Sequence, residues 1–277
     1  LIMDEPTAAL SEHDVGRLFA IVRRLRARGV SIVYISHRLE EIFLLADRVT
    51  VLRDGAHVAT KPVAATDRAD LIHMMVGRRI EQLFPKVEVP LGPPVLELRD
   101  LARPPATNGV SLTVRAGEIV GLAGLVGSGR SELAQAIFGV TPAAEGEILV
   151  DGRREVVRSV ADARRLGIAY VPEDRGIQGL VRPMSVRENA SLAMLGELAR
   201  LGFIDRGAEL RLAEDVVARF GVRTAGVEQV VGRLSGGNQQ KIVLGKWLAA
   251  RPRVLILDEP TRGIDVGAKA EIHRLMG

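Results

Sequence analysis

The sequence contains no cysteine, and only 3% of its 277 residues are aromatic. The absence of cysteine excludes a disulfide framework and is typical of a reducing compartment. No apolar run approaches the roughly 18 residues of a membrane-spanning helix, so we expect no transmembrane segment. The formal net charge is only +4 and the arginines are spread along the chain, which predicts no nucleic acid partner. Hydrophobic residues make up 47% of the chain, which suits a globular core.

A glycine-rich turn and an acidic strand end stand out late in the sequence. Residues 234–239 read LSGGNQ, in which two glycines let the backbone approach a ligand closely. The first N–H groups of the helix that follows are then directed at an anion. Residues 254–257 form an apolar run typical of a buried parallel strand, and Asp258 and Glu259 follow it. Carboxylates in this position lie at the crevice where open α/β sheets bind ligands.

A second glycine-rich segment, residues 124–131 (GLVGSGRS), matches the phosphate-binding pattern G-x-x-x-x-G-K-[ST] except at Arg130, which replaces lysine. Such a loop presents successive backbone N–H groups to phosphates and a hydroxyl to Mg²⁺. Arginine keeps the charge of lysine, but its planar fork is bulkier and differently directed. We therefore expect a loop that holds nucleotide but turns it over poorly, and a glycine-rich turn without nucleotide is the alternative. The residues expected to contact nucleotide here are Gly124, Gly127, Ser128, Gly129, Arg130 and Ser131.

These motifs resemble those of a known family. LSGGNQQ resembles the signature motif of ABC ATPases, and LILDEP resembles their Walker B strand with its adjoining glutamate. The segments GNQQK and DEPTRGIDVGAK are similar to the second cassette of tandem sugar-import ATPases of the ribose, galactose and xylose type. The resemblance implies ATP and Mg²⁺ as cofactors, and membrane permease subunits with, indirectly, a periplasmic sugar-binding protein as partners. It also implies a peripheral position at the cytoplasmic face of the inner membrane.

The resemblance assigns roles to the acidic residues and to one histidine. Asp258 would hold Mg²⁺ together with Ser131, and Glu259 would orient or deprotonate the attacking water. Asp4 and Glu5 would play the same parts in an earlier copy, where His37 resembles the switch histidine that contacts the γ-phosphate. The alternative is that these acids are solvated strand ends that form caps with Thr7 and Thr261. The signature residues expected at the nucleotide are Ser235, Gly236, Gly237 and Gln239.

An internal repeat predicts two copies of one domain. The run LIMDEPT at residues 1–7 recurs as LILDEPT at residues 255–261. The sequence therefore predicts a piece of a longer protein, with residues 1–80 as the C-terminal part of a first cassette. Residues 81–94, with four prolines, would be a linker, and residues 95–277 a second cassette lacking its C-terminal end.

The expected fold is α/β, with a mostly parallel sheet in each cassette, an antiparallel part and a helical insert in the second. Periodicity and turn residues predict helices over 15–25, 67–76 and 131–138, and a helical insert over 186–222. Buried strands are expected at 30–35, 118–123, 166–171 and 254–257, antiparallel strands at 95–101 and 110–114, and hairpins around Asp54-Gly55 and Asp151-Gly152.

The resemblance also predicts which half-sites are present. ABC cassettes pair head to tail as a pseudo-dimer, each nucleotide lying between one P-loop and the other signature motif, and neither site would be complete in this chain. Glu173 stands where the family has a glutamine, so the site with Arg130 is expected to be the weaker one, and the chain alone to hydrolyse ATP negligibly. Two rivals stay open: a soluble ABC ATPase of non-transport type, and a catalytically degenerate, nucleotide-gated module.

Overall fold

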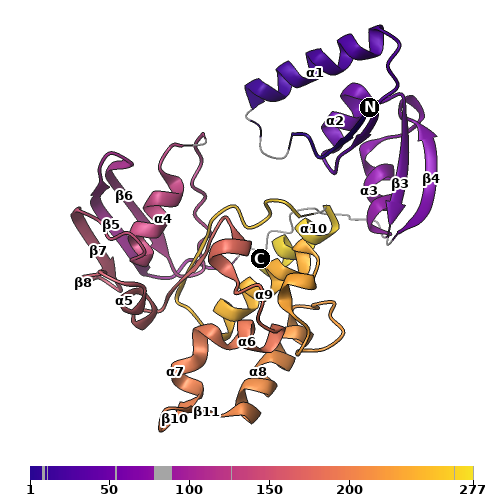
Figure 1. Ribbon diagram of the computed structural model, residues 1–277. Coiled ribbons are helices and arrows are strands. Elements are labelled where there is room, and N and C mark those ends of the chain that lie inside the picture. Colours follow the sequence, from indigo (N-terminus) through magenta and orange to yellow (C-terminus); the bar gives the residue numbers. More distant parts are fainter. Residues whose placement is uncertain are drawn as a thin grey trace. The chain divides into compact units, whose positions relative to one another are not determined.

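The computed structural model describes residues 1–7, 10, 12–53, 55–77, 89–125, 127–264 and 266–276. The chain forms two compact units, which are described separately below. The first comprises Leu1–Pro85 together with Gly263–Gly277, and the second comprises Lys86–Arg262 (Figure 1). None of the helices in the described ranges combines the length and the apolar character needed to cross a membrane. Residues 81–88 of the predicted linker lie outside the described ranges, and the predicted division at 80 and 94 stays a prediction.

The first unit combines a short parallel pair of strands with a helix-backed hairpin. Its elements are β1 (Ile2–Asp4), α1 (Glu12–Ala27), β2 (Val33–Ile35), α2 (Leu39–Leu45), β3 (Arg48–Arg53), β4 (Ala56–Pro62), a 3₁₀ turn (Val63–Ala65), α3 (Arg68–Val76) and α10 (Val266–Met276). Strands β1 and β2 are parallel, and β3 and β4 form the predicted hairpin. Helix α3 begins where the Asp67 carboxylate accepts the Asp70 N–H and ends at Gly77, which is left-handed, as the sequence predicts.

The parallel pair in the first unit is less buried than expected. Val33 is 58% exposed and Ile35 is 46% exposed, and the strand begins at Val33 rather than at residue 30. The expectation of a buried strand was therefore wrong here, because within the described ranges nothing covers the face that carries these side chains. The core of this unit lies instead between the hairpin and its helices, around Leu39, Val51, Leu71 and Ile72.

The second unit contains a four-stranded antiparallel sheet in the order β6-β5-β7-β8. Its strands are β5 (Pro94–Arg103), β6 (Thr107–Arg115), β7 (Glu145–Val150) and β8 (Arg153–Glu155). The predicted hairpin turn between β7 and β8 is confirmed: Asp151 has φ 50° and Gly152 has φ 75°. Two positive φ values in succession are what a tight two-residue hairpin needs, and Asp-Gly supplies them at little steric cost.

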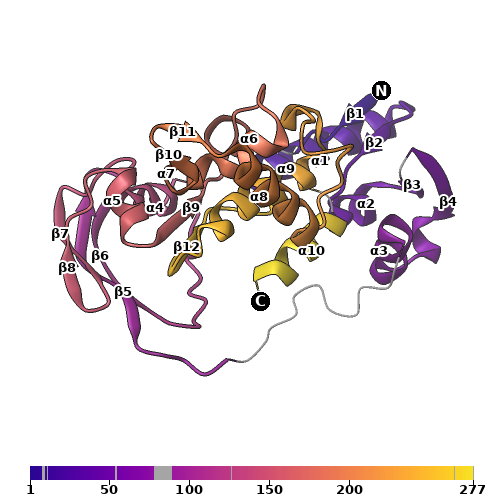
Figure 2. The ribbon, with the colours of Figure 1, turned by 90° about the horizontal axis from the view of Figure 1, so that it is seen from below.

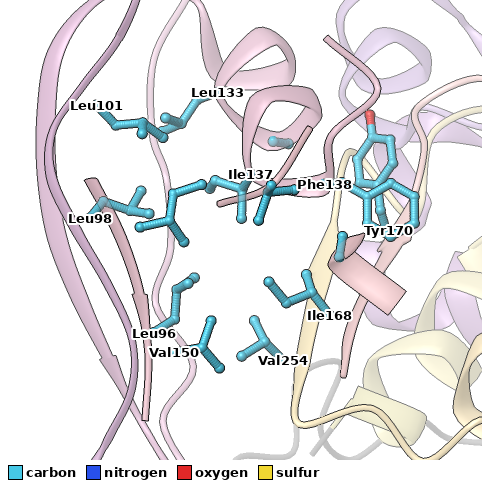
Figure 3. Packing of buried hydrophobic residues seen from close by; sticks show 14 residues of the cluster. Leu96, Leu98, Leu101, Leu133, Ile137, Phe138, Val150, Ile168, Tyr170 and Val254 are labelled. Atoms are coloured by element: carbon cyan, nitrogen blue, oxygen red, sulfur yellow. The ribbon is translucent and has the colours of Figure 1, made fainter. Parts of the chain in front are cut away.

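A hydrophobic core joins this sheet to a parallel pair of strands, β9 (Ile168–Val171) and β12 (Val254–Leu257). Helix α4 (Arg130–Phe138) lies between them and α5 (Val160–Arg165) precedes β9. Figure 3 shows side chains of the sheet, such as Leu98, facing Ile137 of α4, with Phe138 next to Tyr170. The Phe138 ring lies 5.5 Å from the Tyr170 ring and 5.4 Å from the edge-on Trp247 ring, centroid to centroid. Trp247 is partly buried and packs against this core.

Two features of the expected sheet were wrong. The apolar run 118–123 is not a strand, and Ile119 is 76% exposed and Leu122 45% exposed. An apolar run becomes a buried strand only where neighbours satisfy its backbone groups, and within the described ranges no strand pairs with it. The sheet is also not mostly parallel: the largest described sheet is antiparallel, and parallel pairing occurs in β1–β2 and β9–β12. The α/β class itself is confirmed.

The predicted helical insert is present and is built on short helices. Within the predicted bounds 186–222 lie α6 (Val186–Ser191), a 3₁₀ turn (Leu192–Met194), α7 (Leu195–Leu198), a hairpin of β10 (Ala199–Arg200) and β11 (Phe203–Ile204), and α8 (Arg206–Arg219). A π-helical turn (Arg175–Gly179) precedes them, and a 3₁₀ turn (Val231–Arg233) and α9 (Gly236–Ala249) follow. Helices α6, α8 and α9 pack together (Figure 2). Ser185 and Glu188 form a capping box that fixes the start of α6.

Candidate functional site

The loop 124–131 is a tight turn that leads into α4. Gly127 has φ 81°, and Gly129, the N-cap of α4, has φ 90°. A Cβ atom added at Gly129 would lie 2.3 Å from the carbonyl oxygen of Ala106, so no other residue fits without a shift. The Ser128 N–H donates to the Leu125 carbonyl at 3.1 Å and closes the turn. The loop therefore has the tight backbone that an anion-binding helix N-terminus requires.

Arg130 connects this loop to the end of β12. Its Nη2 lies 3.3 Å from Oε1 of Glu259, although the two residues are 129 positions apart. Their side chains are 31% and 43% exposed, so the pair contributes at most about 1 kcal/mol to stability. The pair matters for the positions of the two side chains. Arg130, predicted to bind phosphate, and Glu259, predicted to activate water, contact each other.

Asp258, the predicted Mg²⁺ ligand that directly follows β12, is held by the neighbouring strand β9. Its Oδ2 accepts a hydrogen bond from the Tyr170 hydroxyl at 3.1 Å, and its N–H donates to the Val171 carbonyl at 2.9 Å. Burial and the Asp258 charge raise the pKa of Tyr170 well above its usual value of 10. The phenol therefore stays neutral and keeps donating to the carboxylate, which fixes the side chain at the crevice end of β12.

The residues present suit Mg²⁺ carried by a phosphate ligand. Ser131 and Asp258 offer hydroxyl and carboxylate oxygens, the donors that Mg²⁺ prefers. In the described ranges no group of three or more His, Cys, Asp or Glu residues could hold a metal ion by itself.

The first unit repeats the acidic turn with a different neighbour. Glu5 has φ 46° and Glu259 has φ 45°, so the Asp-Glu-Pro turn has the same left-handed glutamate in both copies. The Glu5 N–H donates to the Ile35 carbonyl at 2.9 Å, which ties the end of β1 to that of β2. His37 follows β2, and its Nδ1 lies 2.7 Å from Oε1 of Glu5. The ends of the two parallel strands thus lie side by side, and His37 contacts Glu5 there.

A buried carboxylate that the sequence analysis missed supports this half-site. The Glu41 side chain is 3% exposed and accepts hydrogen bonds from Thr7 Oγ1 at 2.6 Å, Tyr34 Oη at 2.9 Å and Ser36 Oγ at 2.9 Å. Arg38 adds an ion pair at 3.1 Å. Burial and the bond to Glu41 raise the pKa of Tyr34 to about 12. Thr7 is therefore bound to Glu41 rather than capping Asp4 or Glu5, and the cluster holds both segments that carry the half-site.

Side-chain hydrogen bonds within the signature segment, residues 234–239, and to Val231 just before it hold its turn in shape. Ser235 is the exposed N-cap of α9, and its Oγ accepts a hydrogen bond from Asn238 Nδ2 at 2.9 Å. Gly236 is partly buried, and Gly237 is buried. Gln239 was expected at the nucleotide, but its amide is buried and donates to the carbonyls of Leu234 at 3.1 Å and Val231 at 3.4 Å. Its side chain therefore holds the turn in shape instead of being available to a ligand.

Glu173 is not an isolated anion. It forms an ion pair with Arg262, whose backbone carbonyl accepts a hydrogen bond from Arg175 Nη1 at 2.8 Å. The loop after β9 is thus fastened to the chain after β12. The sequence offered no signal for this contact, because the partners are far apart in the chain.

Comparison with known proteins agrees with this geometry. The family model described as "ABC transporter" matches residues 107–262. A ribose import ATP-binding protein, RbsA 1 of Rubrobacter xylanophilus, is 54% identical over 277 residues, covering 100% of this chain and 55% of its own length. RbsA 2 of Streptomyces avermitilis is 52% identical with the same coverages, and a putative ribose/galactose/methyl galactoside import ATP-binding protein of Agrobacterium fabrum is 49% identical. The chain thus spans about half the length of these curated relatives.

Solved structures share the fold. An ATP-binding cassette of an ABC transporter, MJ1267, has a TM-score of 0.55 at 24% identity over 66% of this chain and 76% of its own. The ATP-binding cassette MJ0796, bound to ADP and Pi as a dimer, has a TM-score of 0.54 at 21% identity over 65% of this chain and 81% of its own. The glycine-rich turn before α4, the acidic end of β12 and these matches lead to one conclusion: the chain belongs to the ABC transporter family.

Proposed function

We propose that the chain is part of the ATP-binding and ATP-hydrolysing subunit of a bacterial ABC importer of monosaccharides. Support comes from the names of the relatives, ribose import ATP-binding proteins at about half identity, and from the two acidic strand ends described above. The partners would be membrane permease subunits and, indirectly, a periplasmic sugar-binding protein. The protein would lie peripherally at the cytoplasmic face of the inner membrane.

ATP would bind at the loop 124–131 in the second unit. The N-terminal amides of α4 would face the phosphates, and Arg130 would donate to them through N–H groups that its contact with Glu259 does not use. Mg²⁺, carried by ATP, would neutralise phosphate charge and would be held by Ser131 and Asp258. The 3.3 Å ion pair between Arg130 and Glu259 would persist with ATP bound and keep the Glu259 carboxylate engaged.

Hydrolysis is assigned to the half-site of the first unit. Phosphoryl transfer needs a group that orients the attacking water in line with the leaving oxygen. Glu5 can accept a proton from this water. His37, whose Nδ1 lies 2.7 Å from Oε1 of Glu5, orients the Glu5 carboxylate. Asp4 would hold the metal, and the signature turn of Ser235, Gly236 and Gly237 would close on the γ-phosphate in the head-to-tail pairing. The single observation that carries this assignment is that Glu5 pairs with a histidine, whereas Glu259 pairs with Arg130.

A second candidate follows from that same contrast. With its carboxylate engaged by Arg130, the second unit has the features of a nucleotide-gated module that binds ATP without turnover. The non-transport reading has no comparable support, because the relatives matched over the whole chain are named as import proteins.

ATPase rates of two variants test the proposal in a protein of the relatives' full length that contains this chain. Loss of a general base costs about 10²–10⁴-fold, so Glu5→Gln should reduce the rate at least 100-fold. Glu259→Gln, its matched control in the other copy, should change the rate by less than about threefold, because its carboxylate has no catalytic part in the proposal. Equal loss in both variants, or loss in Glu259→Gln alone, would refute the assignment.

A further inference from the structure

A cavity of about 680 Å³ lies in the second unit, away from the candidate nucleotide site. Its wall is formed by Gly167 and Arg253, which directly precede β9 and β12, and by the β7–β8 hairpin. Asp258 follows the other end of β12. Because β9 and β12 are parallel and four residues long, the two ends are about 13 Å apart. A ligand in this cavity would therefore not compete with ATP at the loop 124–131.

The lining is rich in arginine. Four arginines and two acidic residues line it: Arg153, Arg164, Arg165, Arg253, Asp151 and Glu155. The balance is positive, and guanidinium forks match phosphate oxygens in geometry as well as in charge. Val150 and Leu166 add apolar surface. The volume falls in the range of about 300–1,000 Å³ that small-molecule sites occupy.

Part of this lining is fixed by its own bonds. Arg253 forms an ion pair with Asp151, which ties the start of β12 to the hairpin turn. A Cβ atom on Gly167 would lie 2.9 Å from Cγ of Arg253, so the arginine lies against a backbone that only glycine leaves open. Arg165 pairs with Asp162 at 2.9 Å, and Arg164 donates to the Ala193 carbonyl. These groups are positioned before any ligand arrives.

Two groups on β8 are uncommitted. Within the described ranges, neither the Arg153 guanidinium nor the Glu155 carboxylate has a side-chain partner. They are two positions apart on one strand, and side chains at that spacing point to the same face. Arg154 lies between them on the opposite face and pairs with Glu147 at 3.1 Å. The cavity thus presents an unused cation beside an unused hydrogen-bond acceptor.

We propose that this cavity binds a small phosphorylated sugar or polyol. The phosphate would be held by Arg153 with the neighbouring guanidinium groups, and hydroxyl groups would donate to Glu155. The pairing of cation and carboxylate argues for this class over a simple anion, since a carboxylate repels a bare phosphate but accepts from hydroxyls. The proposal is independent of the proposed import function.

Isothermal titration calorimetry of the whole chain tests it with glucose 6-phosphate, inorganic phosphate and glucose as probes. Glucose 6-phosphate should bind at least about tenfold more tightly than inorganic phosphate, and glucose should not bind measurably. Arg153→Gln should weaken glucose 6-phosphate binding about tenfold or more, whereas Arg154→Gln, which removes the same charge from the other face, should change it less than about twofold.

Two further variants separate this site from the nucleotide loop. Arg130→Ala should leave glucose 6-phosphate binding unchanged, so failure of the nucleotide proposal would not affect this result. Glu155→Ala should weaken binding of glucose 6-phosphate but not of inorganic phosphate. Absence of glucose 6-phosphate binding, equal affinity for inorganic phosphate, or an effect of Arg154→Gln equal to that of Arg153→Gln would overturn the proposal.

Discussion

At the scale of single residues, the two Asp-Glu-Pro turns show how one local structure acquires two electrostatic settings. Glu5 and Glu259 share a left-handed backbone near φ 45°. The Glu5 carboxylate contacts the His37 ring, whereas the Glu259 carboxylate contacts the Arg130 guanidinium. The repeat could be predicted from the sequence, because the same seven-residue pattern recurs. The different partners could not, since a side chain 129 positions away is placed by the fold and not by the motif.

Arg130→Lys should strengthen binding of Mg-ATP by about three- to tenfold. Lysine keeps the charge as a compact ammonium on a flexible stem, which reaches phosphates more easily and loses the contact of Arg130 Nη2 with Glu259. Fluorescence titration with a labelled ATP analogue measures this directly. Arg158→Lys, at an exposed position of the same unit, is the control. No gain in affinity would contradict our account of the loop.

Lys246 should make the stability of the second unit depend on pH. It is 6% exposed, its Nζ donates to the Gly179 carbonyl at 2.6 Å, and burial lowers its pKa to about 8. Between about pH 8 and 10 the unfolded chain keeps the proton that the folded chain releases, so the free energy of unfolding should rise with pH in that window. The free energy of unfolding should rise by about 1–3 kcal/mol. The hydrogen bond to the Gly179 carbonyl favours the charged lysine and so makes this rise smaller.

Urea denaturation followed by Trp247 fluorescence reports on this unit, because Trp247 is the single tryptophan of the chain and packs against its core. In Lys246→Met the rise between pH 8 and 10 should disappear. Parallel pH profiles for the variant and the natural chain would show that the lysine titrates normally.

At the scale of elements, close contact between α8 and α9 depends on Gly245, which has no side chain. A Cβ atom on Gly245 would lie 2.5 Å from Cγ1 of Val216 and 3.1 Å from the Phe220 ring. Gly245→Ala should therefore destabilise the unit by about 1–3 kcal/mol through overpacking, although alanine favours helix by about 1 kcal/mol. Gly196→Ala in α7, where a Cβ atom meets nothing within 4 Å, is the matched control. Urea midpoints that are equal for both variants would contradict this packing account.

The elements differ in how far local sequence determines them. Helices α1, α3 and α4 and both hairpins could be predicted, because periodicity, caps and Asp-Gly turns act within a few residues. The segment 118–123 was misjudged, because a strand also needs a distant neighbour for its backbone groups. The same limit applies at the site: the loop 124–131 could be located by its glycines, but Glu41 and the buried amide of Gln239 depend on contacts that only the folded unit provides.

At the scale of the whole molecule, the similarity to known proteins differs along the chain. The family match covers 107–262, most of the second unit, whereas the curated relatives match all of the chain but extend to nearly twice its length. Nucleotide binding is therefore best tested in the second unit, where the loop, Asp258 and Glu259 occur together. Hydrolysis is expected to need parts from both copies, so the chain alone should bind ATP without turning it over.

Calorimetric titration of the chain with Mg-ATP, followed by a single-turnover hydrolysis assay on the same sample, tests this claim most directly. We predict one bound nucleotide per chain, affinity at least about tenfold weaker in Arg130→Ala, and hydrolysis far below the ~1–100 s⁻¹ typical of phosphoryl-transfer enzymes. Absence of binding, binding that is unaffected by Arg130→Ala, or hydrolysis by the chain alone within that range would contradict the account.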